Sequence, residues 1–446
     1  MNTKTLIQPR TLKGFRDFLP ESMIPREKLM ETTREVYRSY GFVPIDTPAL
    51  EYAEILCGKG SEETDRQMFR FEDHGGRDVG MRFDLTVPLA RFVAQHANEL
   101  GMPFKRYHIG NVWRGENPQK GRYREFAQCD FDTIGTTSIA SDVETALVIH
   151  DLMRAIGFEK FKIRINNRKV LNGLLQKFEL GEYSVGVLRC IDKLPKAGRE
   201  KVRAEMLEVT GASEQQVDQI LELANLTGAS QEVLKSLAEI CSGNELAEQG
   251  HGELAELIDA TSAVGITDEH LNIDVSIARG LDYYTGTIFE TFLDDLLGIG
   301  SVCSGGRYDD LAGLFTKQPL PGIGASLGLD RLLAAMTELG MIPQARSTAK
   351  VLVVQFSKEN LNHYLKIASE LRRHGIATEV YPDAKKLGNQ FKYADRRGFR
   401  AVIVAGDDEI AAGKVQVKWM EDGSQHDLDL DDGCITLADW INDKIE

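Results

Sequence analysis

Basic side chains crowd a short segment of the chain, from Pro103 to Arg124. The segment holds one acidic residue, Glu116. Its basic residues are Lys105, Arg106, Arg114, Lys120, Arg122 and Arg124. A guanidinium group can donate to two phosphate oxygens at once, so the cluster is typical of a triphosphate site. A solvated surface loop would carry the same residues, so this interpretation needs support from the rest of the chain.

Glycines form a second pattern, in the peptide PGIGASLG that precedes Asp330 and Arg331. The spacing of Gly322, Gly324 and Gly328 is GxGxxxG, which differs from the dinucleotide fingerprint. The chain also lacks the GxxxxGK[ST] loop that cradles phosphates. A bound nucleotide would therefore be held by arginines. The glycines would instead let another backbone or a planar ligand approach closely.

The elements around these residues predict an antiparallel sheet with helices beside it. Residues 25–40 favour a helix, residues 69–83 a hairpin, and the stretches on both sides of the loop 117–124 favour strands. Strand patterns return at 270–293 and 301–306, and residues 321–340 read as a strand running into a helix. Between them, residues 201–260 carry twelve acidic and three basic residues with helical spacing of the apolar ones, which indicates a helical insertion.

Beyond Pro343 the pattern becomes that of a small α/β domain. Short apolar strands alternate with helices at 360–373 and 386–397, and a linker is expected near residues 344–348. The predicted fold is an α+β catalytic domain with a helical insertion and a C-terminal α/β domain. The predicted boundaries are 1–170 and 266–343 for the two parts of the catalytic domain, 171–265 for the insertion and 349–446 for the terminal domain.

Composition narrows the class of protein. The chain is 42% hydrophobic and 27% charged, as ordinary globular proteins are, and no apolar run reaches the ~20 residues of a membrane span. The opening MNTKTLIQPR lacks the apolar stretch of a signal peptide, so a cytoplasmic protein without a membrane partner is expected. The six cysteines are widely spaced, which disfavours both disulfides and a zinc site. The net charge of −15 argues against a nucleic-acid partner, unless basic residues gather locally.

Several of these segments together resemble the class II aminoacyl-tRNA synthetases, and most closely the histidyl-tRNA synthetase family. The helix and strand ending at Pro48 are similar to motif 1, VWRGENPQKGRYREFAQCDFD to motif 2, and GIGASLGLDRLL to motif 3. The peptides ARGLDYYTGTIFE and CSGGRYDDL match the two signatures of the histidyl enzymes, and LKGFRDFLP and FDLTVP also match. The resemblance covers nearly the whole chain. Through motif 1 it implies a homodimer.

The resemblance also implies roles in ATP binding. It assigns Arg114 to the α-phosphate, Glu116 and Phe126 to the adenine, and Arg331 to the γ-phosphate. Arg279 looks like the arginine that this family adds at the α-phosphate, so Arg114 and Arg279 are the expected catalytic residues. ATP would bind with Mg²⁺. Positive charge placed around the α-phosphate can promote attack by the substrate carboxylate without a protein nucleophile.

For the amino acid, the resemblance implies a histidine pocket in which Arg114 and Arg279 also take part. Residues similar to those holding the α-amino group are Asp84, Thr86 and Gln128, those facing the imidazole are Asp132 and Tyr284, and Arg307 and Tyr308 lie nearby. A carboxylate and a phenol can bind both ring nitrogens, and such a site rejects ligands that lack them by up to ~10⁴–10⁵. Tyr283 is expected in the core, because adjacent strand residues face opposite sides.

Three positions depart from the bacterial pattern of the family. Many bacterial members carry Glu where this chain has Asp84 and Asp132, and His where it has Gly115. The FDLTVP and QCDFD forms look more like the eukaryotic and archaeal branch. Pocket distances should therefore differ from those of typical bacterial members.

The terminal domain bears on the nucleic-acid question. Residues 366–400 hold nine basic and four acidic residues, whereas 421–446 hold nine acidic and one basic. A basic face with Phe391 and Tyr393 can bind phosphates and stack unpaired bases, although an ordinary helix surface would look the same. The domain resembles the anticodon-binding module of the class IIa enzymes, which implies tRNA(His) as a partner.

The implied function is ligation of L-histidine to tRNA(His) at the expense of ATP. One alternative is the regulatory paralogue that assists ATP phosphoribosyltransferase, which generally lacks the C-terminal domain and loses catalytic arginines. Another is a different class II synthetase, such as the prolyl or threonyl enzyme. The two histidyl signature peptides argue against this second alternative.

Overall fold

An eight-stranded sheet organises the first of two units into which the chain divides. We describe a computed structural model that covers residues 6–57, 66–277, 283–342 and 346–445. The first unit comprises Met1–Arg16 and Leu29–Leu339, and the second comprises Asp17–Lys28 and Gly340–Glu446. In their order across the sheet, the strands are β1 (Val43–Pro44), β5 (Phe104–Trp113), β6 (Glu125–Ile134), β11 (Gly322–Gly328), β10 (Cys303–Tyr308), β9 (Thr287–Leu293), β7 (Phe161–Asn167) and β8 (Leu271–Ile273).

The interior of this sheet is antiparallel. Only the outer pairs, β1 with β5 and β7 with β8, are parallel among the described strands. The longest ladder joins β5 and β6, which are ten residues each and run in register from Phe104 opposite Ile134 to Trp113 opposite Glu125. The predicted α+β fold class is confirmed. The strands predicted on both sides of the loop 117–124 form this central hairpin.

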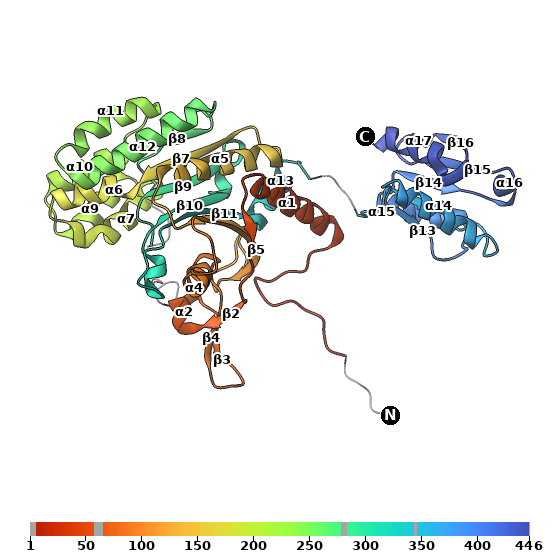
Figure 1. The fold of residues 1–446 in the computed structure, drawn as a ribbon, viewed down its shortest axis with the longest axis horizontal. Coiled ribbons are helices and arrows are strands. Elements are labelled where there is room, and N and C mark those ends of the chain that lie inside the picture. Colours follow the sequence, from red (N-terminus) through yellow and green to blue (C-terminus); the bar gives the residue numbers. More distant parts are fainter. Residues whose placement is uncertain (1–5, 58–65, 278–282, 343–345, 446) are drawn as a thin grey trace. The chain divides into compact units, whose positions relative to one another are not determined.

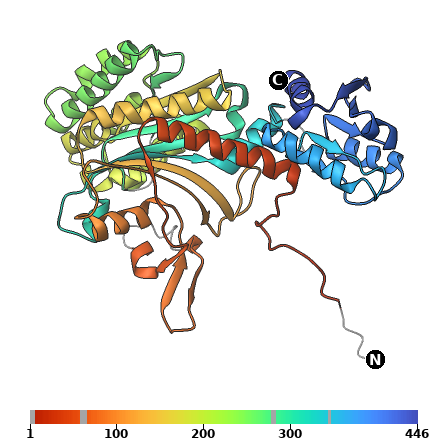
Figure 2. The same cartoon turned by 45° about the vertical axis from the view of Figure 1, so that its right-hand side comes forward.

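Helices and a smaller sheet flank the large sheet (Figures 1 and 2). Helix α5 (Ile139–Ile156) packs against β11 and β7, and α13 (Leu329–Glu338) against β6. On the other side lie α2 (Ala53–Cys57), α4 (Thr86–His96) and a three-stranded sheet in the order β2 (Leu50–Tyr52), β4 (Asp78–Met81) and β3 (Arg70–Glu72). The pairing of β3 with β4 is the hairpin predicted over residues 69–83. Helix α1 (Pro20–Ser39) begins five residues before the predicted start.

The helical insertion lies between β7 and β8 in the sequence. Its α-helices are α6 (Arg168–Lys177), α7 (Ser184–Asp192), α8 (Leu194–Ala197), α9 (Arg199–Thr210), α10 (Glu214–Ala224), α11 (Ser230–Cys241) and α12 (Glu245–Ala263). The insertion also holds the short 3₁₀ turn η1 (Gly181–Tyr183), whereas η2 (Asp294–Ile299) follows β9 and η3 (Leu311–Leu314) follows β10. Apolar side chains at helical spacing, such as Val217, Ile220 and Leu221, are buried, so the insertion has a core of its own.

The second unit carries a five-stranded sheet between two layers of helices. The strands follow the order β13 (Thr378–Val380), β12 (Val351–Val353), β14 (Ala401–Val404), β15 (Lys414–Trp419) and β16 (Gln425–Asp429). The first three are parallel and the last two antiparallel. The helices are α14 (Leu361–Arg373), α15 (Leu387–Arg397), α16 (Asp407–Ala411) and α17 (Ile435–Ile445), with a 3₁₀ turn η4 at Asp432–Cys434.

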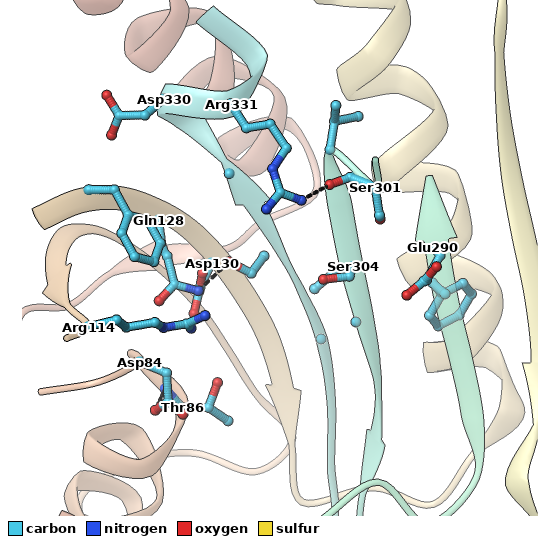
Figure 3. Close-up of a pocket in the computed structure, with 18 of the residues that line it drawn as sticks. Asp84, Thr86, Arg114, Gln128, Asp130, Glu290, Ser301, Ser304, Asp330 and Arg331 are labelled. Carbon is cyan, nitrogen blue, oxygen red and sulfur yellow. Dashed lines mark hydrogen bonds between the residues drawn. The ribbon is translucent and has the colours of Figure 1, made fainter. Parts of the chain in front are cut away.

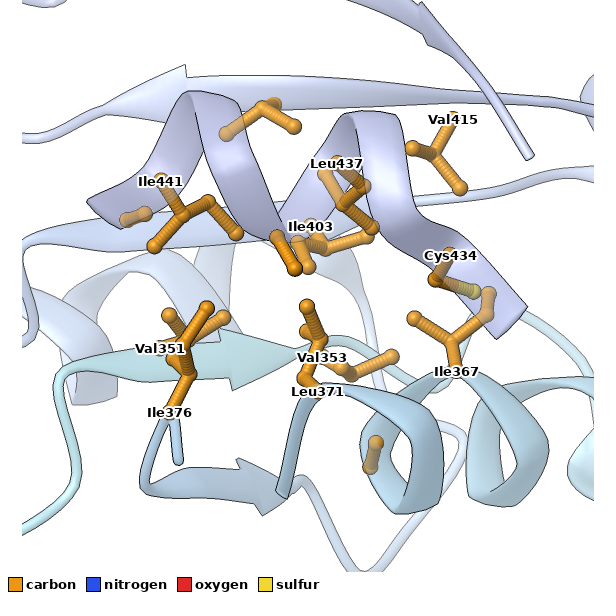
Figure 4. Packing of buried hydrophobic residues seen from close by; sticks show 14 of the residues in the cluster. Val351, Val353, Ile367, Leu371, Ile376, Ile403, Val415, Cys434, Leu437 and Ile441 are labelled. Atoms are coloured by element: carbon orange, nitrogen blue, oxygen red, sulfur yellow. The ribbon is translucent and has the colours of Figure 1, made fainter. Parts of the chain in front are cut away.

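Alternate residues of β12 point to opposite faces of this sheet. They therefore belong to two separate hydrophobic cores. Val351 and Val353 pack with α14 and α17, as Figure 4 shows, whereas Leu352 packs with α15. No helix in the described ranges is long and apolar enough to cross a membrane.

Candidate active site

A cavity of about 300 Å³ opens on the large sheet, lined by β6, β9, β10, β11, the start of α13 and the segments around Asp84 and Tyr284 (Figure 3). It brings together most of the predicted site residues. Those that line it are Asp84, Thr86, Arg114, Glu116, Phe126, Gln128, Asp132, Tyr284, Tyr308 and Arg331. They come from positions almost 250 residues apart, so the sheet is what assembles them.

Strand β6 presents every second side chain to the cavity. Phe126, Gln128, Asp130 and Asp132 all line it, because residues two apart in a strand share a face. The neighbouring strand β11 places Gly324 opposite Asp132 and Ser326 opposite Asp130. A Cβ atom at Gly324 would lie far inside van der Waals distance of the Phe131 carbonyl and the Asp132 carboxylate. The glycine therefore makes room for the carboxylate, which agrees with the close approach predicted for PGIGASLG.

One end of the cavity is rich in arginine. The Nε of Arg114 donates to the Phe83 carbonyl at 3.1 Å, and its guanidinium lies over the Phe83 and Phe126 rings, 4.4 and 5.1 Å from their centroids. Arg331 donates to the carbonyl of Ser301. Burial lowers the pKa of Arg331, and the charges of Arg122 and Arg114 lower it further. Three arginines that repel one another at one place are stabilised by an anionic ligand.

The basic cluster predicted around motif 2 does not act as one phosphate patch. Only Arg114 and Arg122 of its six members line the cavity. Lys105 pairs with Glu144 at 2.7 Å, and Lys120 pairs with Glu338 at 2.7 Å. Arg106 pairs with Asp132, and Arg124 donates to the Glu116 carbonyl at 3.1 Å. Their positions in the strands, and not their proximity in sequence, decide which of them can reach a ligand.

A contact of the N-terminal segment supports the arginine end and was not anticipated. Arg16 forms an ion pair with Asp330, and its guanidinium lies 3.7 Å from the centre of the Tyr123 ring. The other oxygen of Asp330 accepts a hydrogen bond from the Ala127 amide at 2.8 Å. Asp330 and Tyr123 both line the cavity. Arg16 thus links the loop after Arg114 to the first turn of α13.

The other end of the cavity is acidic and buried. One oxygen of Asp84 accepts from the amides of Thr86 and Val87, at 3.1 and 2.9 Å, where α4 begins. Asp132 is held by a 2.6 Å ion pair with Arg106, which is fully buried, and accepts the hydroxyl of Tyr308. Burial raises the pKa of both carboxyls, and the neighbouring arginines oppose that shift. Asp132, which was predicted to face the imidazole with Tyr284, is therefore preassembled with Tyr308, which was predicted to lie nearby.

Asp130 is a cavity residue that the sequence prediction missed. It is 2% exposed, and one of its oxygens, Oδ1, has no hydrogen-bond partner among the described residues. Burial and the charge of Asp132 raise its pKa to about 7, despite Arg106. The alternation of QCDFD could have revealed it, because Asp130 lies two residues from both Gln128 and Asp132. Glu290, Ser301 and Ser304 also line the cavity without having been predicted.

Arg307 was predicted near the histidine pocket, and the structure corrects this. It lies next to Tyr308 on β10, so its side chain takes the opposite face of the sheet. There it pairs with Asp142 of α5 and donates to the carbonyls of Thr136 and Ser138 at 3.1 and 3.3 Å. Arg307 and Asp142 are 4% and 1% exposed. This arginine anchors α5 to the sheet.

Tyr283 was predicted to be a core residue; it packs against the core that contains Leu89 and Tyr308, and it also lines the cavity together with Tyr284. The prediction assumed strand alternation, but β9 begins only at Thr287, so the two tyrosines lie on a turn. Arg279, the second expected catalytic residue, lies outside the described residues. Within the described ranges, no group of three or more His, Cys, Asp or Glu side chains could hold a metal ion.

The aromatic residues predicted for base stacking in the second unit are not both available. Tyr393 donates to Glu379 and packs edge-on against Tyr381, 5.3 Å between ring centres. Phe391 is partly buried in the same core. Their positions on the inner side of α15 explain this, whereas Lys392 and Arg396 on its outer side are exposed. The basic charge of this segment therefore faces solvent, whereas Tyr393 is partly buried.

Comparisons with known proteins agree over the whole chain. The sequence model of a family described as histidyl-tRNA synthetase matches residues 14–332, and that of an anticodon binding domain matches residues 350–439. A curated relative from Rhodopirellula baltica, named histidine–tRNA ligase, is 60% identical over 423 residues, which cover 95% of this chain and 96% of the relative.

Solved structures give the same result. The crystal structure of a histidyl-tRNA synthetase from Nostoc sp. has a TM-score of 0.89 and 36% identity, covering 98% of this chain and all of that one. A structure from Bacillus halodurans, described as an ATP phosphoribosyltransferase regulatory subunit/histidyl-tRNA synthetase, has a TM-score of 0.75 at 23% identity, covering 90% and 99% of the two chains. This last likeness shows a shared fold alone.

Proposed function

The chain belongs to the histidyl-tRNA synthetase family, and from that premise we propose how its pocket residues divide the reaction. It is an ATP-dependent aminoacyl-tRNA ligase that converts L-histidine and ATP to histidyl-adenylate and pyrophosphate, then transfers histidine to the 3′ end of tRNA(His). The observation that carries the proposed division is the polarity of the cavity. Arg331 and Arg122 lie toward one end, the buried carboxylates toward the other and Arg114 between them, which suits a triphosphate beside an amino acid.

We assign the arginine end to ATP. Arg114 would bind the α-phosphate and Arg331 the γ-phosphate, with the adenine between Glu116 and Phe126. The repulsion among Arg114, Arg122 and Arg331 supports this role, because phosphate oxygens remove it. Arg279 keeps its proposed place at the α-phosphate through the family resemblance.

We assign the acidic end to histidine. Asp84, Thr86 and Gln128 would hold the α-ammonium group, and Asp132 and Tyr284 would hold the imidazole. The contacts of Asp132 with Arg106 and Tyr308 favour its ionised form against burial and hold it in one orientation. Such preorganisation supports the discrimination of histidine from amino acids that lack its ring nitrogens.

The chemistry then requires only positioning and positive charge. A carboxylate oxygen of histidine forms a bond to the α-phosphorus, and the bond from that phosphorus to the β-phosphate oxygen breaks, with the electron pair leaving on pyrophosphate. Charge grows on the phosphoryl oxygens, where Arg114 and Arg279 would stabilise it.

We propose that ATP enters as its Mg²⁺ complex. Mg²⁺ in nucleotide sites is commonly held by the phosphates and one or two carboxylates. Glu290 lines the cavity and raises the pKa of Arg331 through its charge. This glutamate fits the role of a Mg²⁺ ligand.

We further propose a homodimer and a cytoplasmic location. The segment similar to motif 1 supports the dimer, because Val43, Leu50 and Tyr52 are 45–48% exposed on β1 and β2. Analytical ultracentrifugation would test the oligomeric state, and a monomer at micromolar concentration would contradict it. Cell fractionation would test the location.

ATP–pyrophosphate exchange across the twenty amino acids tests the function itself. We expect exchange with L-histidine only, and absence of histidine-dependent exchange would refute the ligase. The same assay excludes the regulatory alternative, whose fold is shared by the Bacillus halodurans structure. For the division of roles, Arg114→Ala and Arg279→Ala should slow exchange far more than they weaken histidine binding measured by calorimetry. Unchanged exchange would remove the residue concerned from the catalytic step.

A further inference from the structure

We propose that Asp130 is a further binding residue for the substrate, which accepts a hydrogen bond from the α-ammonium group of histidine beside Asp84 and Gln128. The inference rests on the proposed assignment of this end of the cavity to histidine. It adds a residue that neither the sequence resemblance nor the comparisons assign.

Two buried acceptors on β6 lack donors. Oδ1 of Asp130 and Oε1 of Gln128 have no hydrogen-bond partner among the described residues, and the two side chains are 2% and 8% exposed. Nε2 of Gln128 donates to the Ser326 hydroxyl at 2.7 Å, which fixes the amide with its oxygen as the remaining acceptor. A buried acceptor without a donor costs free energy, so a ligand that supplies donors is stabilised there.

Charged groups of both signs surround Asp130. Its neighbours include Arg106 and His108 of β5, Asp132 of β6, Ser326 of β11, and the Asp84 and Tyr284 carboxyl and phenol groups, and it also interacts with the charges of Arg82 and Arg114. Arg106 is paired with Asp132, and His108 with Asp46 at 2.9 Å. Burial lowers the pKa of His108 to about 4, so this imidazole is neutral near pH 7. Three carboxyl groups share this buried region, and an ammonium group would supply a donor to the Asp130 oxygen that has none among the described residues.

The ammonium group satisfies these conditions better than the imidazole does. It carries one full charge and three donors, whereas a neutral imidazole carries a single N–H. Asp130 raises the pKa of Arg114 together with Asp84, so both aspartates lie near the arginine proposed to bind the α-phosphate. Figure 3 shows Asp84, Gln128, Asp130 and Arg114 on the same side of the cavity. Asp132, in contrast, accepts the Tyr308 hydroxyl and is assigned with Tyr284 to the ring.

Asp130→Asn tests this with little change of shape. We expect the KM for L-histidine in ATP–pyrophosphate exchange to rise about 10- to 100-fold, the range of a lost charge-assisted hydrogen bond. The KM for ATP should stay within twofold. Two competing ligands separate the contacts. Binding of L-histidinol, which keeps the ammonium group, should weaken in parallel, whereas binding of imidazolepropionate, which lacks that group, should not. Glu144→Gln, a carboxylate on α5 outside the cavity, is the matched control and should leave all four values unchanged.

The outcomes separate the inference from its premise. Equal weakening of histidinol and imidazolepropionate would mean that Asp130 contacts the ring, and an unchanged KM for histidine would mean that it contacts neither group. Either result overturns the inference. If Asp130→Asn fails to fold, the binding of histidinol and of imidazolepropionate to the wild type should be compared at pH 5.5 and 7.5. Only histidinol should bind more tightly at pH 7.5, because only its ammonium group gains from ionisation of Asp130. Failure of histidine-dependent exchange in the wild type would instead refute the proposed function.

Discussion

The three aspartates of the cavity differ in what stabilises their charge. Asp132 has a buried arginine and a phenol, and Asp84 has two amides at the start of α4. Asp130 has one oxygen without a partner in the described part of the chain, and its pKa is about 7. The same side-chain type therefore occurs with two satisfied carboxylates and with one that has an oxygen left for a ligand, although burial raises the pKa of all three.

This difference predicts a pH dependence of histidine binding. A cationic ligand favours the ionised form of Asp130, so binding below pH 7 must release its proton. The Kd should improve up to about tenfold per pH unit between pH 5.5 and 7 and level off above. Calorimetry with wild type and Asp130→Asn would measure it, because the imidazole of the ligand titrates equally in both. Identical pH profiles would contradict the prediction.

Arg307 gives a second prediction at the scale of single residues. Arg307→Met leaves Asp142 buried without its charge partner, which should lower the free energy of unfolding by about 3–5 kcal/mol. The KM for histidine should not change. Denaturant unfolding measures the first effect, and Arg307→Met with Asp142→Leu should recover most of the loss. A raised KM at unchanged stability would support the binding role that the family resemblance implied.

The motif resemblance predicted Arg114, Arg331, Asp84 and Asp132, which line the cavity, but residue types and spacing left out Asp130 and Glu290. Types and spacing were also not sufficient for Arg106 and Arg307, whose partners Asp132 and Asp142 are 26 and 165 positions away. Pairings of this kind depend on strand register and helix placement, which local sequence does not fix. The role of Arg16 was missed for the same reason.

Among the elements, the paired strands β10 and β11 owe their close contact to glycine. Gly305 and Gly306 of β10 face Ala325 and Gly324 of β11. A Cβ at Gly305 would collide with the Gly324 carbonyl and with Ala325. The floor of the cavity is thus backbone, which leaves the volume above it for the ligand.

Gly324→Ala should therefore destabilise the sheet and displace Asp132. We expect a loss of about 1–3 kcal/mol in the free energy of unfolding, together with a raised KM for histidine. Thermal unfolding and exchange kinetics measure the two effects. Gly298→Ala, where an added Cβ has no neighbour within 4 Å, is the control and should change stability by less than about 0.5 kcal/mol. Equal behaviour of the two variants would show that β11 tolerates a side chain.

Elements in which apolar residues recur with a clear period were predictable from the sequence. The elements at the C-terminal end were not. The hairpin of β5 and β6, the glycine strand with α13, and the parallel strands of the second unit all lie where apolar residues alternate or repeat. Residues 421–446 were read only as acidic, yet they form β16 and α17. Their buried residues, such as Leu437 and Ile441, are few and lie among aspartates. The spacing of the apolar residues was therefore difficult to recognise in so acidic a segment.

For the whole molecule, the net charge of −15 is a sum over segments whose local charges differ in sign. The insertion and the last 26 residues hold most of the excess acid, while the outer side of α15 is basic. Binding of tRNA(His) through that side should weaken as salt rises, since bound phosphates release counterions.

Removing Lys392 and Arg396 together should reduce the slope of log K against log salt by about 1 per lost phosphate contact. Lys366→Ala is the control, because Lys366 is equally exposed but lies on α14, which covers the opposite face of the domain sheet. Filter binding at several salt concentrations gives the slopes. A slope that Lys366→Ala changes as much as the double variant would place the RNA elsewhere.

The ion pair of Arg16 with Asp330 joins residues 314 positions apart. During synthesis the first of these leaves the ribosome long before the second exists. The arginine end of the cavity also needs Arg331, so the nucleotide site forms only after the entire helical insertion has been synthesised. A growing chain therefore gains its enzymatic competence in one late step, and truncated translation products carry the amino-terminal signatures of the enzyme without its activity.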